Sequence, residues 1–253
     1  MLKFFKKVLL TILATAGIRI DTINKSRVIA FVCIGVGYLF HLVIADSISL
    51  NVALTYFLLL FIVRYVFLFW GFAKHGFSEW LINKYGAVKA WNIYELFTSV
   101  MFFQRGLSFG LLIEATQWSI LNITDWLQMN STEFIVFKYS CTVIGICLTL
   151  VGMWINVSAA IVIGIDTYYY KDLFLKKALG EFKVAGSYKY FSNPMYGVGQ
   201  LSGYGAALMT GSILGIAATL LNQLLMYIFY FLIEKPHIKA IFSTPKQHPQ
   251  LDG

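Results

Sequence analysis

Long apolar runs with few charges constrain the fold of this 253-residue chain more than any other feature. A helix that crosses the hydrocarbon core of a bilayer needs about 20 mainly apolar residues. The runs that approach or exceed this length are 28–45, 50–70, 96–121, 134–155 (or on to 165), 199–210 and 213–233. They are continuous rather than alternating, which favours helices over the strands of a membrane barrel.

The composition supports the same class. Hydrophobic residues make up 58% of the chain and charged residues 13%, whereas soluble domains average about 45–50% and about 25%. These values exclude a disordered chain, a coiled coil and an ordinary soluble enzyme. We therefore predict an all-α fold, a polytopic membrane helical bundle of about six spans that forms a single domain over residues 1–253.

The last two apolar runs are separated by Thr210-Gly211-Ser212. Gly and Ser at this point suit a tight turn, so the sequence predicts a C-terminal helical hairpin. The first arm, residues 199–210, is short for a full crossing. We expect it to be tilted or partly buried in protein.

Lysine and arginine alternate between loops in a way that predicts orientation. They occur in segments 1–27, 71–95 and 166–198 and in the tail from 234, but not in loops 46–49 and 122–133. Basic loops are retained in the cytoplasm, so both termini are predicted there. The net charge of +8 then reflects this bias and attraction to anionic lipid, not a nucleic-acid partner. A bacterial inner membrane and an endoplasmic reticulum both fit, and the oligomeric state stays open.

The first residues allow two interpretations. Lys3, Lys6 and Lys7 beside apolar residues resemble the start of a signal peptide. The same spacing suits an amphipathic helix lying on the membrane. We favour the amphipathic helix, because the basic segment from Arg19 to Arg27 that follows fits a cytoplasmic surface.

Ionisable residues inside the apolar runs are candidates for function, because such groups are costly in a bilayer and usually face a bundle interior. Arg64 and Lys138 lie near predicted helix ends and can reach the interface. Arg105 and Glu114 are nine residues apart, about 900° of helical rotation, which places them on opposite faces. Either is a candidate to contact a polar substrate head or a neighbouring helix.

The three cysteines, Cys33, Cys141 and Cys147, lie inside apolar runs without a metal-binding spacing. We expect buried thiols in helix packing and no metal site.

A segment rich in Tyr and Gly, residues 186–199, leads into the hairpin. Glycine lets a backbone approach a ligand closely, and Asn193-Pro194 imposes an extended or turn conformation. The helix that follows offers free N–H groups to an anionic ligand. A simple entry cap for that helix is an equal alternative. The other end of the hairpin carries Glu234 and His237, so the predicted topology brings both motifs to one cytoplasmic rim.

Together these motifs resemble the integral-membrane methyltransferases, a family that includes isoprenylcysteine carboxyl methyltransferase and the phospholipid N-methyltransferases. The resemblance covers residues 166–243 and is greatest to the phosphatidylethanolamine N-methyltransferases. The matching positions are Gly186, Tyr188, Lys189, Tyr190, Pro194, Met195, Tyr196, Glu234, Pro236, Ile238 and Phe242. The chain departs at Ser192 and Asn193, where the family often has Arg-His, at Lys235, where it often has Glu, and in the glycine after Tyr196.

The resemblance implies S-adenosylmethionine as the cofactor, with residues 134–253 as the cofactor-binding core and 1–133 as N-terminal spans. The implied cofactor-binding residues are Tyr188, Tyr190, Asn193, Pro194, Met195, Tyr196, Gly197, Gly199, Glu234 and His237. Glu234 would bind ribose hydroxyls or the ammonium group, and tyrosine rings would hold the sulfonium by cation–π attraction.

The implied reaction methylates the amine of phosphatidylethanolamine, or of its methylated derivatives, at the cytoplasmic face of the membrane. The amine must be neutral to attack, which requires a base or a desolvated site. Glu114 and Glu234 are the catalytic candidates. The membrane lipid would enter sideways between spans.

Other functions stay open at this point. Carboxyl methylation of a prenylated cysteine is the nearest alternative. A small polytopic transporter would use Arg64, Arg105 and Glu114 as a path, but the 186–242 pattern has no second copy, as transporter repeats would require. The departures at 192, 193 and 235 also allow a non-catalytic scaffold.

Overall fold

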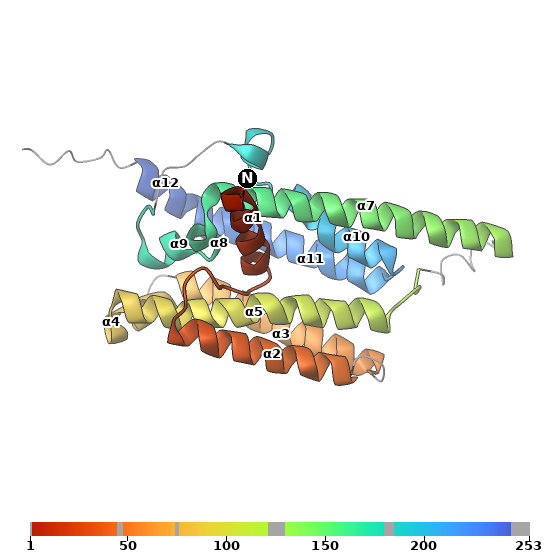
Figure 1. The fold of residues 1–253 in the computed structure, drawn as a ribbon, viewed down its shortest axis with the longest axis horizontal. Coiled ribbons are helices and arrows are strands. Elements are labelled where there is room, and N and C mark those ends of the chain that lie inside the picture. The colour runs from red at the N-terminus through yellow and green to blue at the C-terminus, as the bar shows by residue number, and fades with distance from the viewer. Residues whose placement is uncertain (1, 45–47, 74–75, 121–129, 180–184, 244–253) are drawn as a thin grey trace, which may run out of the picture.

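The computed structural model describes residues 2–44, 48–73, 76–120, 130–179 and 185–243. Its long helices run side by side (Figure 1), and the described residues contain no strand. These helices are α2 (Lys25–Ile44), α3 (Leu50–Phe72), α5 (Ala87–Ala115), α7 (Ser131–Ile163) and α11 (Ile213–Phe229). The predicted all-α membrane bundle is confirmed.

Among the described residues, five helical stretches are long and apolar enough to cross a membrane, compared with the predicted number of about six. The predicted fifth span becomes α10 (Leu201–Met209), a helix of nine residues. At 1.5 Å per residue it is about 14 Å long, about half the thickness of the hydrocarbon core. The hairpin is confirmed, because α10 and α11 pack together, and α11 returns the chain to the end of the bundle where α2 begins (Figure 1).

The turn of the hairpin is fixed by residues that follow α5. The Trp118 N–H donates to the Thr210 carbonyl at 2.8 Å, and the Ile120 N–H donates to the Gly211 carbonyl at 2.9 Å. Gly211 adopts φ +63°, a conformation that glycine reaches without strain. These bonds satisfy backbone groups that would have no other partner in hydrocarbon.

The third span begins and ends earlier than its hydropathy predicts. Helix α5 covers Ala87–Ala115 rather than 96–121, and residue 121 lies outside the described residues. The predicted loop 71–95 included Lys89, so residues 87–95 were not expected to belong to the span. Glu95 is only 1% exposed, and its charge is neutralised by two arginines, so the helix tolerates it.

Shorter helices cluster mainly at the end of the bundle where α2 begins (Figure 1). They are α1 (Leu2–Thr15), α4 (Phe77–Tyr85), α8 (Ile165–Tyr168), α9 (Lys171–Leu175), the 3₁₀ turns η2 (Gly186–Lys189) and η3 (Val198–Gln200), the π-helical turn η4 (Tyr230–Glu234) and α12 (Lys235–Ser243). Helix α1 lies across the long helices and packs against α7.

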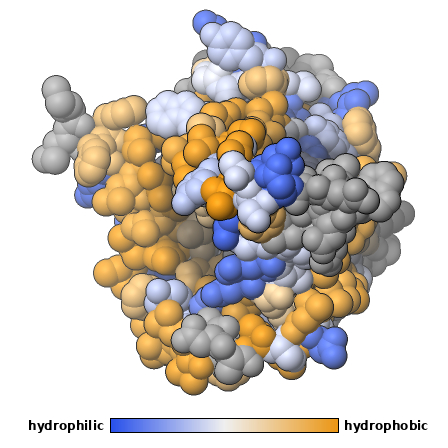
Figure 2. All heavy atoms as spheres, turned by 90° about the vertical axis from the view of Figure 1, so that its right-hand side faces the viewer, coloured by the Kyte–Doolittle hydropathy of each residue, from blue (hydrophilic) through white to orange (hydrophobic). Residues whose placement is uncertain are grey.

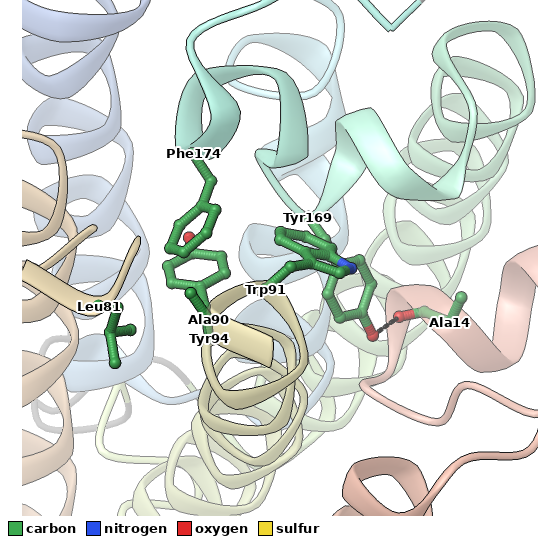
Figure 3. Packing of buried hydrophobic residues seen from close by; sticks show 7 residues of the cluster. All are labelled: Ala14, Leu81, Ala90, Trp91, Tyr94, Tyr169 and Phe174. Atoms are coloured by element: carbon green, nitrogen blue, oxygen red, sulfur yellow. Dashed lines mark hydrogen bonds between the residues drawn. The ribbon is translucent and has the colours of Figure 1, made fainter. Parts of the chain in front are cut away.

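An aromatic cluster joins α9 and α1 to α5 (Figure 3). The rings of Tyr94 and Phe174 lie 4.7 Å apart between centroids. Trp91 packs edge-on against Phe174. The Tyr169 hydroxyl donates to the Ala14 carbonyl at 2.8 Å. Burial of several aromatic rings in one place fixes the short helices against the bundle.

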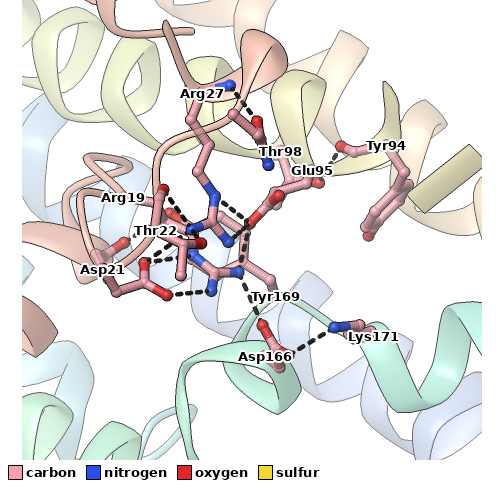
Figure 4. A network of polar contacts seen from close by, with 12 residues as sticks. Arg19, Asp21, Thr22, Arg27, Tyr94, Glu95, Thr98, Asp166, Tyr169 and Lys171 are labelled. Carbon is pink, nitrogen blue, oxygen red and sulfur yellow. Dashed lines mark hydrogen bonds and ion pairs between the residues drawn. The ribbon is translucent and has the colours of Figure 1, made fainter. Parts of the chain in front are cut away.

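An ion-pair network surrounds Glu95 (Figure 4). Arg27 contacts Glu95 at 2.8 Å, and Arg19 pairs with both Glu95 and, at 2.9 Å, Asp166. Lys171 contacts Asp166 at 2.7 Å. The network therefore connects the α1–α2 linker and α2 to α5, α8 and α9. Glu95 and the two arginines are its largely buried centre, whereas Asp166 is 41% exposed.

Glycines allow α7 and α10 to approach closely, as small residues do between membrane helices. A Cβ on Gly152 would lie 2.1 Å from the Ser202 nitrogen, and one on Gly145 would lie 2.5 Å from the Met209 nitrogen. A Cβ on Gly205 would lie 2.5 Å from the Gly145 carbonyl oxygen. This contact fixes the position of the segment that precedes α10.

Viewed from the end of the bundle where α7 begins, hydrophobic residues cover much of the surface (Figure 2), as expected of a surface in contact with lipid. Many large hydrophobic residues of α2, α3 and α7 are exposed. The expectation of three buried thiols is corrected here: Cys141 is buried, whereas Cys33 and Cys147 are exposed on this surface. Apolar runs do not distinguish a lipid-facing side chain from a core one.

We expect Gly152→Ala to destabilise the protein, because the added methyl group has no space beside the backbone of α10. Overpacking of this kind costs about 1–3 kcal/mol. The thermal unfolding midpoint in detergent should fall. Gly110→Ala is the control, since a Cβ there meets nothing within 4 Å; its midpoint should not fall. Equal midpoints for the two variants would contradict the proposed close packing.

The network around Glu95 predicts a loss of stability in acid. Burial alone would raise the pKa of Asp21 and of Asp166, but hydrogen bonds and charges from Arg19 and Lys171 outweigh it and lower both pKa values. Such carboxylates stabilise the fold at pH values above their unfolded pKa of about 3.9. The stabilisation is lost as the pH falls through the lowered folded-state pKa values.

Thermal unfolding of the wild type, followed from pH 6 to pH 3, should therefore show a declining midpoint below about pH 4. Asp166→Asn should lower the midpoint at pH 6 and flatten the decline. Glu114→Gln, at an exposed carboxylate outside the network, should follow the wild type. An Asp166→Asn profile parallel to that of the wild type would exclude the network as the cause.

Candidate functional site

A cavity of about 680 Å³ lies inside the bundle. Its walls come from α3, α5, α7, α10 and α11, and its rim includes Tyr188, Glu234 and His237. Aromatic and aliphatic side chains line most of it, with a few polar groups among them. This combination of size and lining is typical of a small-molecule site.

The segment before α10 forms one wall, and amide side chains hold it. Asn156 of α7 donates to the Gly199 carbonyl at 2.9 Å, and Gln223 of α11 donates to the Tyr196 carbonyl at 3.1 Å. Gln200 donates to the Met195 carbonyl at 2.9 Å. These bonds satisfy carbonyls of irregular backbone, as depth in a membrane protein requires.

The glycines of this segment serve close packing. A Cβ on Gly199 would lie 2.4 Å from the Asn156 side chain, and one on Gly197 would lie 3.0 Å from the Tyr227 hydroxyl. Pro194 is fully buried, and its carbonyl accepts from the Gly199 N–H at 2.7 Å. The segment is thus a tightly packed turn that presents the neighbouring side chains to the cavity.

Glu234 lies in a π-helical turn, η4, that joins α11 to α12. The Lys235 N–H bonds to the Tyr230 carbonyl, five residues back. Pro236 follows and has no N–H to continue an α-helical ladder, which accounts for a turn of different geometry at this point. Such turns are frequent at functional sites because they redirect side chains. Here Glu234 lines the cavity.

A chain of buried hydroxyls ends at the Glu234 carboxylate. The Tyr196 hydroxyl donates to Glu234 Oε2 at 2.8 Å and lies 3.2 Å from the Tyr170 hydroxyl. Burial, together with the charge of Glu234, raises the pKa of Tyr196 and of Tyr170. Both phenols therefore stay protonated at physiological pH and act as hydrogen-bond donors.

A second carboxylate, Asp172, lies near Glu234. Its backbone carbonyl is 3.2 Å from His237 Nε2, and its charge acts on Glu234. Burial raises the pKa of Asp172, although the nearby His237 opposes the shift. Two carboxylates at one rim make this end of the cavity favourable for a cationic ligand.

Six of the predicted cofactor-binding residues line this cavity. They come from η2, from the turn before α10 and from the η4–α12 segment, and they are Tyr188, Asn193, Met195, Tyr196, Glu234 and His237. Burial and the charge of Glu234 raise the pKa of Tyr188 as well. The two motifs that the sequence brought to one rim are thus side by side in the fold.

The other predicted residues are placed elsewhere. Tyr190 is 80% exposed and does not line the cavity. Glu114 is exposed near the end of α5 and also lies outside the lining. Arg105 does line it, on the opposite face of the same helix, as the helical rotation predicts. Pro194, Gly197 and Gly199 shape the wall and present no side chain to the cavity lining.

Several polar residues of the site were missed by the sequence analysis. They lie in helices or short connecting turns and are Tyr170, Asp172, Asn156, Gln200, Asn222 and Gln223. For the four amides the available signal is their position inside apolar runs, where an amide needs an internal partner. Tyr170 and Asp172 carried no such signal.

Comparison with known proteins finds a family that is similar to this region. Residues 140–245 match the family model described as "Phospholipid methyltransferase". The match covers less than half of the chain and shows that this segment is similar to that family. The resemblance inferred from the motifs at 186–199 and 234–242 is thereby confirmed.

Curated relatives carry the same assignment. A phosphatidylethanolamine N-methyltransferase from Candida albicans is 27% identical over 162 residues, 64% of this chain and 18% of the relative. One from Schizosaccharomyces pombe is 26% identical over 162 residues, which are 61% of this chain and 17% of the relative. One from Meyerozyma guilliermondii is 31% identical over 106 residues, which are 42% of this chain and 12% of the relative. The chain therefore spans less than a fifth of the length of each of these relatives. No solved structure matches it.

Proposed function

We propose that this protein transfers a methyl group from S-adenosylmethionine to the amine of phosphatidylethanolamine or of its methylated derivatives. The observation that carries the proposal is the cavity inside an apolar bundle, with the Tyr170–Tyr196–Glu234 chain at its rim. The family match and the names of the relatives support the same reaction.

The residues at the rim fit the proposed cofactor. S-adenosylmethionine carries a sulfonium and an ammonium group, and the rim offers the carboxylates of Glu234 and Asp172. Tyr188, Tyr196 and Tyr230 add aromatic faces that attract a sulfonium. Glu234 would hold ribose hydroxyls or the ammonium group. When bound, the cofactor supplies an electrophilic methyl carbon and a neutral thioether leaving group.

Residues 134–253 would form the cofactor-binding core, and the helices before residue 134 would complete the cavity for the lipid. This division assigns the cofactor to the matched segment. It assigns α3 and α5, which contribute Phe57, Phe61, Phe102 and Phe109 to the lining, to the acyl chains. Apolar walls also exclude water, which would otherwise compete with the amine.

The amine nitrogen forms a bond to the methyl carbon through its lone pair as the carbon–sulfur bond breaks. A protonated amine has no free lone pair, so it must lose a proton before it attacks. Of the two carboxylates expected to act in catalysis, Glu234 lines the cavity and Glu114 does not. Glu234 is therefore the proposed acceptor of the proton. The Tyr196 hydroxyl orients the carboxylate through its hydrogen bond.

The site is proposed to face the cytoplasm, with both termini on that side. The loops and helix ends near the rim carry Lys84, Lys89, Lys171 and Lys235, which agrees with the retention of basic segments in the cytoplasm. A bacterial inner membrane and an endoplasmic reticulum remain equal candidates for the host membrane.

We expect variants at the rim to weaken cofactor binding. Loss of a hydrogen bond to a charged group costs about 1.5–3 kcal/mol. Isothermal titration in detergent should therefore show Glu234→Ala and Tyr196→Phe binding S-adenosylmethionine at least about tenfold more weakly than the wild type. Glu114→Ala is the matched control and should keep full affinity. Undiminished affinity in both rim variants would refute the site.

The substrate is tested by transfer of a labelled methyl group. Purified protein in vesicles of phosphatidylethanolamine, given methyl-labelled S-adenosylmethionine, should yield label that extracts into chloroform and migrates as an N-methylated phospholipid. Label on a prenylated cysteine peptide, and none on lipid, would identify the carboxyl methyltransferase instead. Glu234→Ala should abolish the transfer in either case.

A further inference from the structure

Two arginines line the cavity on helices other than those that carry the residues proposed to bind the cofactor. Arg64 of α3 and Arg105 of α5 both line it. Both precede residue 140, so they lie outside the segment that matches the family model. Cationic side chains within membrane spans are costly and usually have a functional reason.

Arg64 is held in a fixed position. It is 6% exposed, and it donates to Asn222 Oδ1 at 2.8 Å and to Met226 Sδ at 3.4 Å. Its Nε has no hydrogen-bond partner among the described residues. The guanidinium lies 5.3 Å from the centre of the Tyr65 ring. None of these contacts neutralises its charge.

Arg105 is less restrained. Within the described part of the chain its guanidinium forms no hydrogen bond and no ion pair, although it lines the cavity. The charges of Arg64 and Arg105 repel each other. The carboxylates that line the cavity, Asp172 and Glu234, form no ion pair with either arginine in the described residues. An anion from outside the chain would neutralise these two like charges.

We propose that Arg64 and Arg105 bind the phosphate group of the phospholipid substrate. This inference rests on the proposed function and deepens it, because it names residues that bind the lipid phosphate. These residues lie outside the segment that matches the family model. Guanidinium groups match phosphate oxygens through paired N–H donors. The phosphate would satisfy Arg105 and neutralise both charges.

The position of the pair relative to the rim fits the geometry of the headgroup. Tyr170 lies within electrostatic range of Arg64 and Arg105, and its hydroxyl contacts that of Tyr196. In phosphatidylethanolamine two carbons separate the phosphate ester from the amine. A phosphate held by the arginines would therefore direct the amine past Tyr170 toward Tyr196 and Glu234.

The same wall offers a path for the acyl chains. Helices α5 and α7 both line the cavity, through Gly106 and Phe109 on one side and Thr149 and Met153 on the other. Extensive packing joins α3 to α5 and α7 to α10, but it does not join α5 to α7 in the described residues. A lipid whose phosphate sits at Arg105 would extend its chains between these two helices.

The test is a direct binding measurement with a short-chain probe. Dihexanoylphosphatidylethanolamine is titrated into the protein in detergent, without cofactor, and dihexanoylglycerol is the probe without phosphate. Arg105→Gln should bind the phospholipid at least about tenfold more weakly, since a charge-assisted bond is lost. Binding of dihexanoylglycerol should not change. Arg105→Lys should recover part of the affinity.

Lys89→Gln is the matched control, because Lys89 is an exposed cation on the same helix that does not line the cavity. It should bind as the wild type does. Arg105→Gln removes no hydrogen bond or ion pair within the described protein and relieves the repulsion between Arg105 and Arg64, so its unfolding midpoint should not fall below that of the wild type. Arg64→Gln is the second variant and should show the same loss for the phospholipid.

A measurement of S-adenosylmethionine binding distinguishes the two possible anions, which are the lipid phosphate and the cofactor carboxylate. If Arg105→Gln weakens S-adenosylmethionine and leaves the phospholipid unchanged, the arginines bind the cofactor carboxylate and the inference is overturned. Wild-type protein that does not prefer the phospholipid over dihexanoylglycerol also overturns it. Protein that binds the phospholipid through Arg105 but transfers no methyl group would contradict only the proposed function.

Discussion

A polar group inside an apolar bundle must find its partner within the protein, and this constraint shapes every part of the structure. Water is absent from the hydrocarbon core, so an unpaired amide or charge there is costly. Glu95 is buried because Arg19 and Arg27 neutralise it. The irregular segment before α10 is tolerated because the side-chain amides of Asn156, Gln200 and Gln223 each donate a hydrogen bond to one of its backbone carbonyls. Without these bonds the carbonyls would have no partner.

The same constraint distinguishes structural polar residues from those proposed to act. Asn222 is fully engaged, since it accepts from Arg64 and donates to Gln200. Arg105 has no such partner among the described residues, and it lines the cavity. A polar group that the fold leaves without a partner, in a cavity large enough for a ligand, marks the place where a ligand supplies the missing interaction.

Much of the fold could be predicted from hydropathy, because a membrane helix has to be apolar over its whole length. Helix α3 covers Leu50–Phe72, close to the predicted 50–70. Prediction failed where a charge lies inside a helix. Residues 87–95 were predicted as loop because the partners of Glu95 are distant in sequence. Residues 199–210 were counted as a span, but their short length already indicated a partly buried helix, and α10 packs through glycines against α7.

The candidate site was also predicted in part. The motifs at 186–199 and 234–242 indicated which segments meet, and the hairpin brings them together. They did not indicate that Tyr190 points outward or that Tyr170 and Asp172 complete the rim, since those positions depend on η2, α8 and α9.

The sequence by itself determined the class of protein, the long helices, the family resemblance and the pairing of two motifs, because these follow from local composition and short-range spacing. Only the tertiary structure decided which ionisable residues share a cavity. Arg64 and Arg105 lie on different helices and meet Tyr170 only when the bundle is assembled, while Glu114 turns away on the far face of α5. Helical rotation sets the direction of a side chain, but packing decides what lies in that direction.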